Sequence, residues 1–389
     1  MKSILSLLFV LTCYSNAGAQ PYQIGHVSIT FTDPARGNRA VPTEIYYPAD
    51  VTADNATFTS AITGPVPAIS FGHGFVMAWN AYQNIWEAVA GAGYIIAFPT
   101  TEGSLSPNHG TFGEDLRFVL QQLKAQGNLA SSVLYNRVDT VTCVMGHSMG
   151  GGAAFLAAAA DPTIKAIATL APAETSPGAI SAAGTIATNA LVIAGANDCV
   201  TPPATNQVPM YNNLLSACKH YIAITGGSHC QMAESNAACN FGESTCTPAP
   251  AISRATQHTI INRYLLPWLS SRLKNSCTAG RQFDSTLNAD GEITYQKNCA
   301  LCSGSGIAGA DNSARVSVYP NPFGAVLHVR TPGSAEDEFV LYNVTGKIMR
   351  TTTADSTADV STADLASGVY FYEVRSAAVV VKRGIVVKQ

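Results

Sequence analysis

The residues best suited to do chemistry lie in a pentapeptide, Gly-His-Ser-Met-Gly, at positions 146–150. Its central residue, Ser148, follows an apolar run at 141–145 and precedes an alanine-rich segment at 149–160. A serine on a sharp turn between a strand and a helix has its hydroxyl exposed at the edge of a sheet. The flanking glycines suit such a turn because a Cβ there would clash with neighbouring backbone. We therefore predict that Ser148 is a nucleophile in acyl transfer.

A base and an acid for this serine can be sought later in the chain. A serine hydroxyl is a weak nucleophile unless a base takes its proton and an acid orients that base. On this kind of turn the acid and then the histidine follow the serine in sequence. Asp198 comes after the apolar run 190–194, and His229 follows a strand-like segment that starts at Tyr221. We predict that Asp198 orients His229; Glu174 is the alternative acid, but it precedes the strand expected to carry one.

An oxyanion needs two preorganised donors. One donor is predicted to be the backbone N–H of Met149, the residue after the nucleophile. The other is predicted to be that of Phe75, in the loop Gly-His-Gly-Phe at 72–75 that follows the apolar run 67–71. His73 in this loop either supports the site from behind or faces solvent, and both interpretations stay open. This mechanism requires no cofactor and no metal.

The segments around these residues alternate between short apolar runs and helix-like stretches. The runs that suit strands buried on both faces of a parallel sheet are 67–71, 94–98, 141–145, 164–170 and 190–194. The helix candidates are 81–92, 112–126, 149–160 and 252–274, the last interrupted or kinked at Pro267. Alternation at 27–31 and 43–47 indicates antiparallel strands. Together they predict an α/β fold with a mainly parallel central sheet over residues 20–302. The serine turn and the order of serine, acid and histidine are those of an α/β-hydrolase fold, which we therefore expect here.

The connection between residues 170 and 190 is short and rich in small residues. A cap domain would have to be inserted there, and the segment has no room for one. We therefore expect a shallow, open cleft that favours extended or polymeric esters over a small enclosed metabolite.

The N-terminus and the overall composition indicate the compartment in which the protein acts. Lys2, an apolar run at 4–11 and Ala-Gly-Ala at 17–19 form the pattern of a secretory signal peptide over residues 1–19. Only 12% of the residues are charged and the net charge is −3, which argues against a nucleic-acid partner. We expect a secreted monomer, extracellular or at the cell surface.

The cysteines agree with export to an oxidising compartment. Nine of the ten follow the signal segment, and Cys143, inside a predicted strand, is expected to be a buried free thiol. The sequence does not determine how the other eight pair. Proximity favours Cys239–Cys246 and a bridge from Cys277 to Cys299 or Cys302. Cys199 has two equal candidates, Cys230 and Cys218.

A change of composition follows the last cysteine. Residues 303–315 have the content of a flexible linker, and residues 316–389 show short strands with regular turns, which predicts a small C-terminal β-sandwich. This tail resembles the C-terminal sorting domain of type IX secretion cargo. The resemblance is carried by Val-Tyr-Pro-Asn-Pro-Phe at 318–323, Tyr-Asn-Val-Thr-Gly-Lys at 342–347, Leu-Ala-Ser-Gly-Val-Tyr-Phe at 365–371 and the basic-apolar ending at 382–388. It implies that the type IX machinery is a partner.

Residues 67–274 resemble the cutinase-like polyester hydrolases, including poly(ethylene terephthalate) hydrolases. The matching motifs are Gly-Phe at 74–75, Gly-His-Ser-Met-Gly-Gly at 146–151, Ala-Asn-Asp at 196–198 and Gly-Gly-Ser-His at 226–229. The resemblance implies serine hydrolysis of polyesters and soluble carboxylic esters. One position departs from it: Ala173 stands where those enzymes carry a tryptophan that clamps an aromatic ring.

Two other functions fit the same residues less closely. One is a small-ester or acetyl esterase, or a peptidase, on the same scaffold. The other is a non-catalytic surface-binding protein that retains a hydrolase-like shell.

Overall fold

The computed structural model describes residues 22–302, 316–331, 337–376 and 379–389. The chain forms two compact units that are divided between Cys302 and Ser303. The predicted signal peptide, 1–19, and the predicted linker, 303–315, lie outside the described residues. Among the described helices, none is both long enough and apolar enough to cross a membrane.

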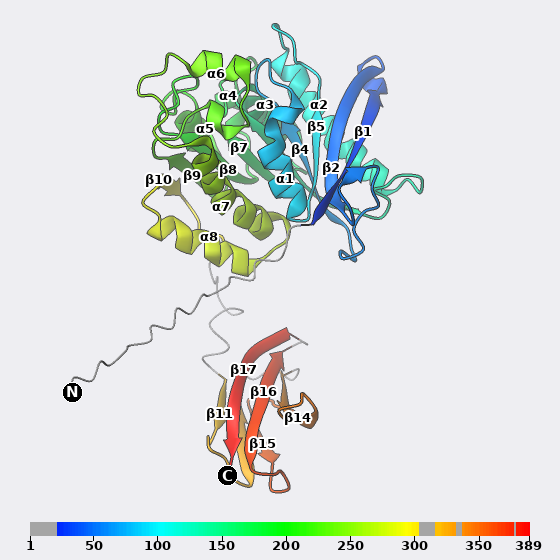
Figure 1. Ribbon diagram of the computed structural model, residues 1–389, viewed down its shortest axis with the longest axis vertical. Coiled ribbons are helices and arrows are strands. Elements are labelled where there is room, and N and C mark those ends of the chain that lie inside the picture. Colours follow the sequence, from blue (N-terminus) through cyan, green and yellow to red (C-terminus); the bar gives the residue numbers. More distant parts are fainter. Residues whose placement is uncertain (1–21, 303–315, 332–336, 377–378) are drawn as a thin grey trace, which may run out of the picture. The chain divides into compact units, whose positions relative to one another are not determined.

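A single sheet forms the centre of the first unit (Figure 1). Its ten strands, counted within residues 22–302, are β1 Gln23–Asp33, β2 Arg39–Ala49, β3 Ala53–Asp54, β4 Val66–Gly72, β5 Ile95–Pro99, β6 Val138–His147, β7 Ala166–Leu170, β8 Asn189–Gly195, β9 Lys219–Ile224 and β10 Ile293–Lys297. They lie in the order β10-β9-β8-β7-β6-β4-β5-β2-β1-β3. The six strands from β9 to β5 are mutually parallel, while β2, β1 and β10 join antiparallel. The mainly parallel sheet predicted from the apolar runs is confirmed.

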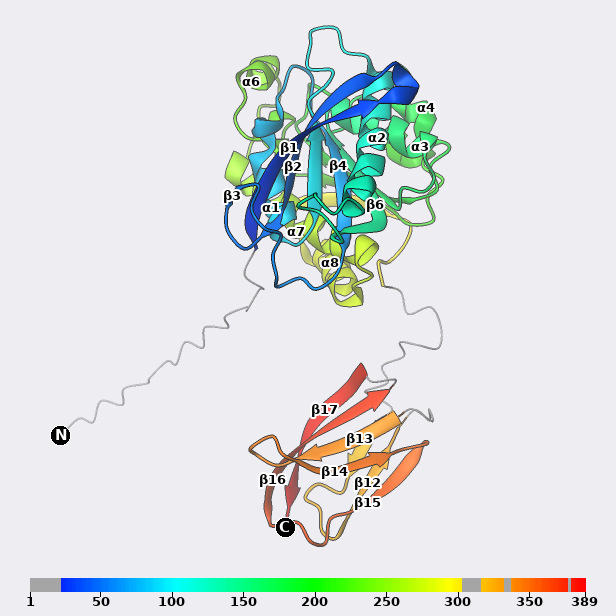
Figure 2. The ribbon, with the colours of Figure 1, turned by 90° about the vertical axis from the view of Figure 1, so that its right-hand side faces the viewer.

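Helices cover both faces of this sheet, as the two views at right angles show (Figures 1 and 2). The helices of the first unit are α1 Gln83–Gly91, α2 His109–Gly127, α3 Met149–Ala160, α4 Ala179–Ala183, α5 Gln207–Asn213, α6 Ala237–Glu243, α7 Arg254–Leu273 and α8 Cys277–Ala289. One face packs against α1, α7 and α8, and the other against α2, α3, α4 and α5. Because both faces are covered, the central strands are mainly apolar, and every residue of β4 and β7 is buried.

The elements of the first unit differ from the expected ones in several places. Helix α7 continues through Pro267, so the expected interruption is wrong; the missing proline N–H removes only one hydrogen bond of the helix. The sequence pattern also missed the helices α4, α5, α6 and α8 and the strands β3 and β10. Strand β10 buries only Ile293, so it shows no apolar run, and it joins the sheet through backbone pairing with β9.

The connection from β7 to β8, residues 171–188, contains only the five-residue helix α4. This segment is described in full, and no cap domain is inserted in it. The carboxyl edge of the sheet, where the loops after the parallel strands meet, therefore has no lid from this connection.

The C-terminal unit consists of two antiparallel sheets around one core. Its strands, as far as the chain is described, are β11 Ser317–Tyr319, β12 Val326–Arg330, β13 Asp337–Tyr342, β14 Ile348–Thr353, β15 Thr357–Ser361, β16 Gly368–Ser376 and β17 Val379–Lys388. They pair in the orders β11-β12-β15 and β14-β13-β16-β17. Leu327 and Val360 of the first sheet share a buried core with Phe339 and Val374 of the second. The predicted β-sandwich is confirmed.

Candidate active site

Ser148 stands on a sharp turn between β6, which ends at His147, and α3, which begins at Met149. Its backbone is strained, with φ 54° and ψ −123°, a combination that non-glycine residues rarely adopt. Close backbone packing forms the turn: a Cβ at Gly146 would lie 2.3 Å from Gly150 O. Larger residues at these positions would push the turn apart, which explains the two flanking glycines.

The side chains of Ser148, His229 and Asp198 form a continuous hydrogen-bonded triad. His229 Nε2 lies 2.9 Å from Ser148 Oγ, and His229 Nδ1 lies 2.8 Å from Asp198 Oδ2. Asp198 follows β8 and His229 follows β9, so both arrive at the carboxyl edge beside Ser148. The Asp198 side chain is fully buried and that of His229 is 2% exposed, so little water competes for these hydrogen bonds. Such an arrangement can transfer the serine proton to the imidazole.

Thr201 fixes the Asp198 carboxylate through hydrogen bonds, and Gln207 in turn fixes Thr201. No sequence motif predicted either residue. The Asp198 carboxylate accepts from Thr201 N at 2.8 Å and from Thr201 Oγ1 at 2.9 Å. Gln207 Nε2 donates to Thr201 Oγ1 at 3.1 Å and to Pro172 O at 2.7 Å. Thr201 lies three residues after Asp198, the spacing of a side chain that caps a turn, and this spacing was the available signal. Glu174, the alternative acid, instead accepts from Ile180 N at 2.8 Å.

The two predicted oxyanion donors belong to the loops next to Ser148. The N–H of Met149 is the first amide of α3, and the first amides of a helix have no acceptor within the helix. Phe75, in the loop after β4, has a 49% exposed side chain. His73 is buried, and its two ring nitrogens contact Gly74 O at 2.9 Å and Thr101 O at 2.8 Å. Its solvent-facing interpretation is therefore wrong; it joins the loops after β4 and β5.

Two disulfides surround the triad, and their pairing corrects the expectation. Cys199, next to Asp198, pairs with Cys246, and Cys230, next to His229, pairs with Cys239. The proposed Cys239–Cys246, Cys199–Cys230 and Cys199–Cys218 bridges are wrong. Cys239 lies within α6 and Cys246 follows the end of that helix, and the two pair with cysteines of different loops, which proximity in sequence does not reveal.

Among the described residues, the other cysteines form two further disulfides and one free thiol. The Cys277–Cys302 bridge confirms one of the two expected partners, and Cys218 pairs with Cys299. Cys143 is a buried free thiol, as predicted. His220 lies with Cys218 and Cys299 in a cluster of metal-ligand type, but the two sulfurs are bonded to each other and so do not serve as ligands.

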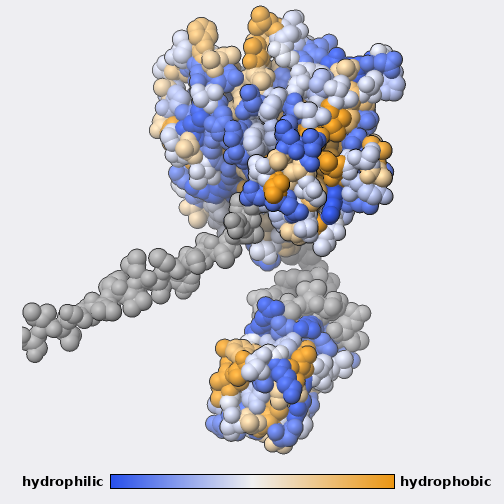
Figure 3. All heavy atoms as spheres, turned by 45° about the vertical axis from the view of Figure 1, so that its right-hand side comes forward, coloured by the Kyte–Doolittle hydropathy of each residue, from blue (hydrophilic) through white to orange (hydrophobic). Residues whose placement is uncertain are grey.

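Exposed apolar side chains occur on the loops around the triad. Phe75 follows β4, Leu105 follows β5, Val200 follows β8 and Phe241 follows β9, with exposed fractions of 49%, 81%, 40% and 82%. Figure 3 shows hydrophobic residues interspersed among polar and intermediate ones on the face that it draws. The four connections that carry these side chains all leave the carboxyl edge of the sheet, the edge at which Ser148 lies.

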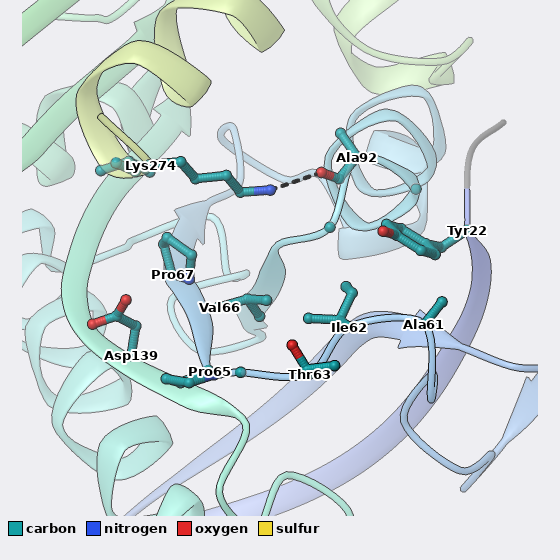
Figure 4. A pocket seen from close by; sticks show the side chains of 14 residues that line it. Tyr22, Ala61, Ile62, Thr63, Pro65, Val66, Pro67, Ala92, Asp139 and Lys274 are labelled. Atoms are coloured by element: carbon teal, nitrogen blue, oxygen red, sulfur yellow. Dashed lines mark hydrogen bonds between the residues drawn. The ribbon is translucent and has the colours of Figure 1, made fainter. Parts of the chain in front are cut away.

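A separate cavity of about 710 Å³ lies at the opposite edge, near the beginnings of β4 and β6 (Figure 4). Lys274 Nζ extends over it and donates to Ala92 O at 2.9 Å. Burial lowers the pKa of Lys274 to about 8. Because the cavity includes Val66, the first residue of β4, it is remote from the carboxyl edge and separate from the triad.

Two family models match the chain. A model described as PET hydrolase-like matches residues 16–245. A model described as a secretion system C-terminal sorting domain matches residues 317–388.

Individual proteins are also similar in sequence to this chain. Cutinase 1 of Thermobifida cellulosilytica is 32% identical over 187 residues, which cover 48% of this chain and 64% of the relative. A cutinase of Thermobifida fusca (strain YX) is also 32% identical over 187 residues, covering 48% and 56%. The bis(hydroxyethyl) terephthalate hydrolase of Streptomyces coelicolor is 25% identical over 226 residues, covering 58% and 60%. The chain thus spans less than two thirds of the length of each of these relatives.

Proposed function

Because the chain belongs to the PET hydrolase-like family, we propose that it is a secreted serine hydrolase of carboxylic esters that acts on polyesters. The observation that carries the proposal is the triad, in which His229 Nε2 lies 2.9 Å from Ser148 Oγ and His229 Nδ1 lies 2.8 Å from Asp198 Oδ2. The exposed apolar side chains on connections at the carboxyl edge of the sheet and the absence of a cap in segment 171–188 support an extended, apolar substrate.

In the proposed mechanism, Ser148 Oγ attacks the ester carbonyl carbon while His229 Nε2 accepts the hydroxyl proton. Asp198 keeps the proton of His229 on Nδ1 and stabilises the imidazolium that forms. The backbone N–H groups of Met149 and Phe75 bind the oxyanion of the tetrahedral intermediate. His229 then protonates the leaving alcohol, and water releases the acid from Ser148 by the same steps.

The C-terminal unit makes this a secreted or cell-surface protein, because it matches a sorting domain of a secretion system. We propose that the type IX machinery recognises this unit, that the signal peptide 1–19 is removed, and that the hydrolase domain 20–302 acts as a monomer outside the cell.

A fluorophosphonate probe tests the serine mechanism. We expect one labelled site, identified at Ser148 by mass spectrometry of the digested protein; a protein that resists labelling would exclude the mechanism. Substrate class is tested separately with soluble esters of increasing acyl length and with aliphatic and aromatic polyester films. Activity that is limited to acetyl esters would remove the polyester assignment.

Thr201→Val is expected to lower kcat on a soluble ester by about tenfold. The valine keeps the shape of the side chain but loses the hydroxyl that donates to the Asp198 carboxylate at 2.9 Å. A hydrogen bond to a charged group contributes about 1.5–3 kcal/mol, and 1.4 kcal/mol corresponds to tenfold in rate. Thr201→Ser retains the hydroxyl and is the control, with a kcat within about threefold of the wild type. Equal values for the two variants would contradict the role of Thr201.

Ala173→Trp is expected to raise the ratio of aromatic to aliphatic polyester hydrolysis by about three- to tenfold, because an aromatic pair contributes about 0.5–1.5 kcal/mol. Ala173 lies beside the nucleophile and donates its N–H to Ser148 O at 2.9 Å. Product release from both films measures the ratio. Ala173→Leu controls for added bulk without a ring, and a similar gain from leucine would argue against a clamp.

A further inference from the structure

A buried series of hydrogen bonds connects the loop after β4 to the backbone of His229. This loop contains Gly74 and Phe75 and is called the oxyanion loop below. Gly74 N donates to Tyr82 Oη at 2.7 Å, and Tyr82 Oη lies 3.0 Å from His147 Nδ1. His147 Nε2 in turn lies 3.2 Å from His229 O. Tyr82 and His147 are both fully buried, and the mechanism above uses neither of them.

The hydrogens of this series can be placed from its ends. His229 O is only an acceptor, so the proton of His147 is on Nε2, and its Nδ1 is free to accept. Tyr82 accepts the Gly74 N–H. It donates its own hydrogen to that Nδ1 at 3.0 Å rather than to Met77 Sδ at 3.3 Å, because a thioether sulfur is the weaker acceptor. Burial, reinforced by the neighbouring His229 imidazole, lowers the pKa of His147 well below its ordinary value, so the ring stays neutral. A neutral ring matters here because its centroid is 4.7 Å from that of His229, which becomes positive during acyl transfer.

The same series of hydrogen bonds fixes two groups on either side of Ser148. Gly74 directly precedes Phe75, whose N–H is the proposed oxyanion donor, so the Tyr82 hydroxyl fixes the peptide that leads into that donor. His147 holds the backbone carbonyl of His229 itself. The packing leaves little freedom, since a Cβ on Gly74 would lie 3.1 Å from Tyr82 Oη and 3.2 Å from His147 Nδ1.

We propose that Tyr82 and His147 are positioning residues that keep the oxyanion loop and the His229 turn at a fixed spacing about Ser148. This inference rests on the proposed function. It predicts that the two residues affect the chemical step rather than substrate binding, because neither reaches the surface.

Tyr82→Phe tests the first link while keeping the ring in contact with Phe71, 4.8 Å away between centroids. We expect kcat on a soluble ester to fall about tenfold with KM within about twofold, since small misplacements of reacting groups cost one to two orders of magnitude. The control is Tyr94→Phe, which removes a hydroxyl from a tyrosine buried in the same core. We expect its kcat to stay within about twofold of the wild type at a comparable melting temperature. Equal kcat for both variants would overturn the proposal.

A second pair of variants keeps the test decisive if Tyr82→Phe does not fold. In His147→Gln, the side-chain amide can accept from Tyr82 and donate to His229 O, whereas His147→Leu fills similar space and can do neither. We expect glutamine to retain kcat within about threefold and leucine to lose about tenfold or more. Equal losses would mean that only the volume of His147 matters. A wild type without esterase activity would instead refute the proposed function, so the two failures are distinguishable.

Discussion

Ser148→Ala is expected to lower kcat on soluble esters by about 10⁶-fold, the loss typical when the nucleophile of such a triad is removed. The alanine leaves His229 with no hydroxyl to deprotonate, while Met149 and Phe75 still offer their N–H groups to the oxyanion. Residual hydrolysis of about 10³- to 10⁴-fold over water should therefore remain. Initial rates with a chromogenic ester measure kcat, and equilibrium binding of a non-hydrolysable ester analogue should be unchanged.

Ser70→Ala is the matched control for this experiment. Ser70 is fully buried in β4, and its hydroxyl has no hydrogen-bond partner among the described residues. Its replacement should leave kcat within about twofold. A Ser148→Ala protein that keeps more than about one per cent of the wild-type rate would exclude Ser148 as the nucleophile.

Asp198→Asn is expected to lower kcat by about 10⁴-fold. The asparagine amide can donate to His229 Nδ1, which the carboxylate cannot do, so the imidazole proton moves to Nε2. That nitrogen lies 2.9 Å from Ser148 Oγ and could then no longer accept the serine proton. The loss should appear equally in the rate of fluorophosphonate labelling, because both reactions require the same proton transfer.

The control is Asp161→Asn, at the end of α3. Asp161 accepts from the backbone and hydroxyl of Thr163 only two residues away, as a helix-end residue does. We expect its kcat within about twofold of the wild type. A loss of less than tenfold in Asp198→Asn would mean that another group orients His229.

Local signals predicted the central part of the fold and the three triad positions. The apolar runs located the parallel strands because strands covered on both faces have no polar alternation. The pattern predicted a helix at residues 149–160, and α3 covers the same residues. Its first residue could be located because the glycines around Ser148 marked the turn before it. Asp198 and His229 could be chosen because the residues after parallel strands meet at one edge.

Features that depend on packing between distant segments were not accessible in this way. Tyr82 and His147 are 65 residues apart, and nothing in either segment predicts their contact. The same is true of Cys199 and Cys246, which are 47 residues apart and are brought together by the loop that contains α6. Strand β10 is held in place by backbone pairing with β9, and backbone pairing leaves little trace in residue type.

The disulfides beside the triad close one covalent ring, which contains His229 and begins at Cys199, the residue directly after Asp198. The ring runs along the chain from Cys199 to Cys230, crosses to Cys239, continues to Cys246 and returns to Cys199. A protease that cuts the ring once, anywhere along its path, leaves Asp198 and His229 still joined through the other half. In a secreted or cell-surface protein, where proteases act, the ring therefore keeps Asp198 and His229 covalently connected after a single cut.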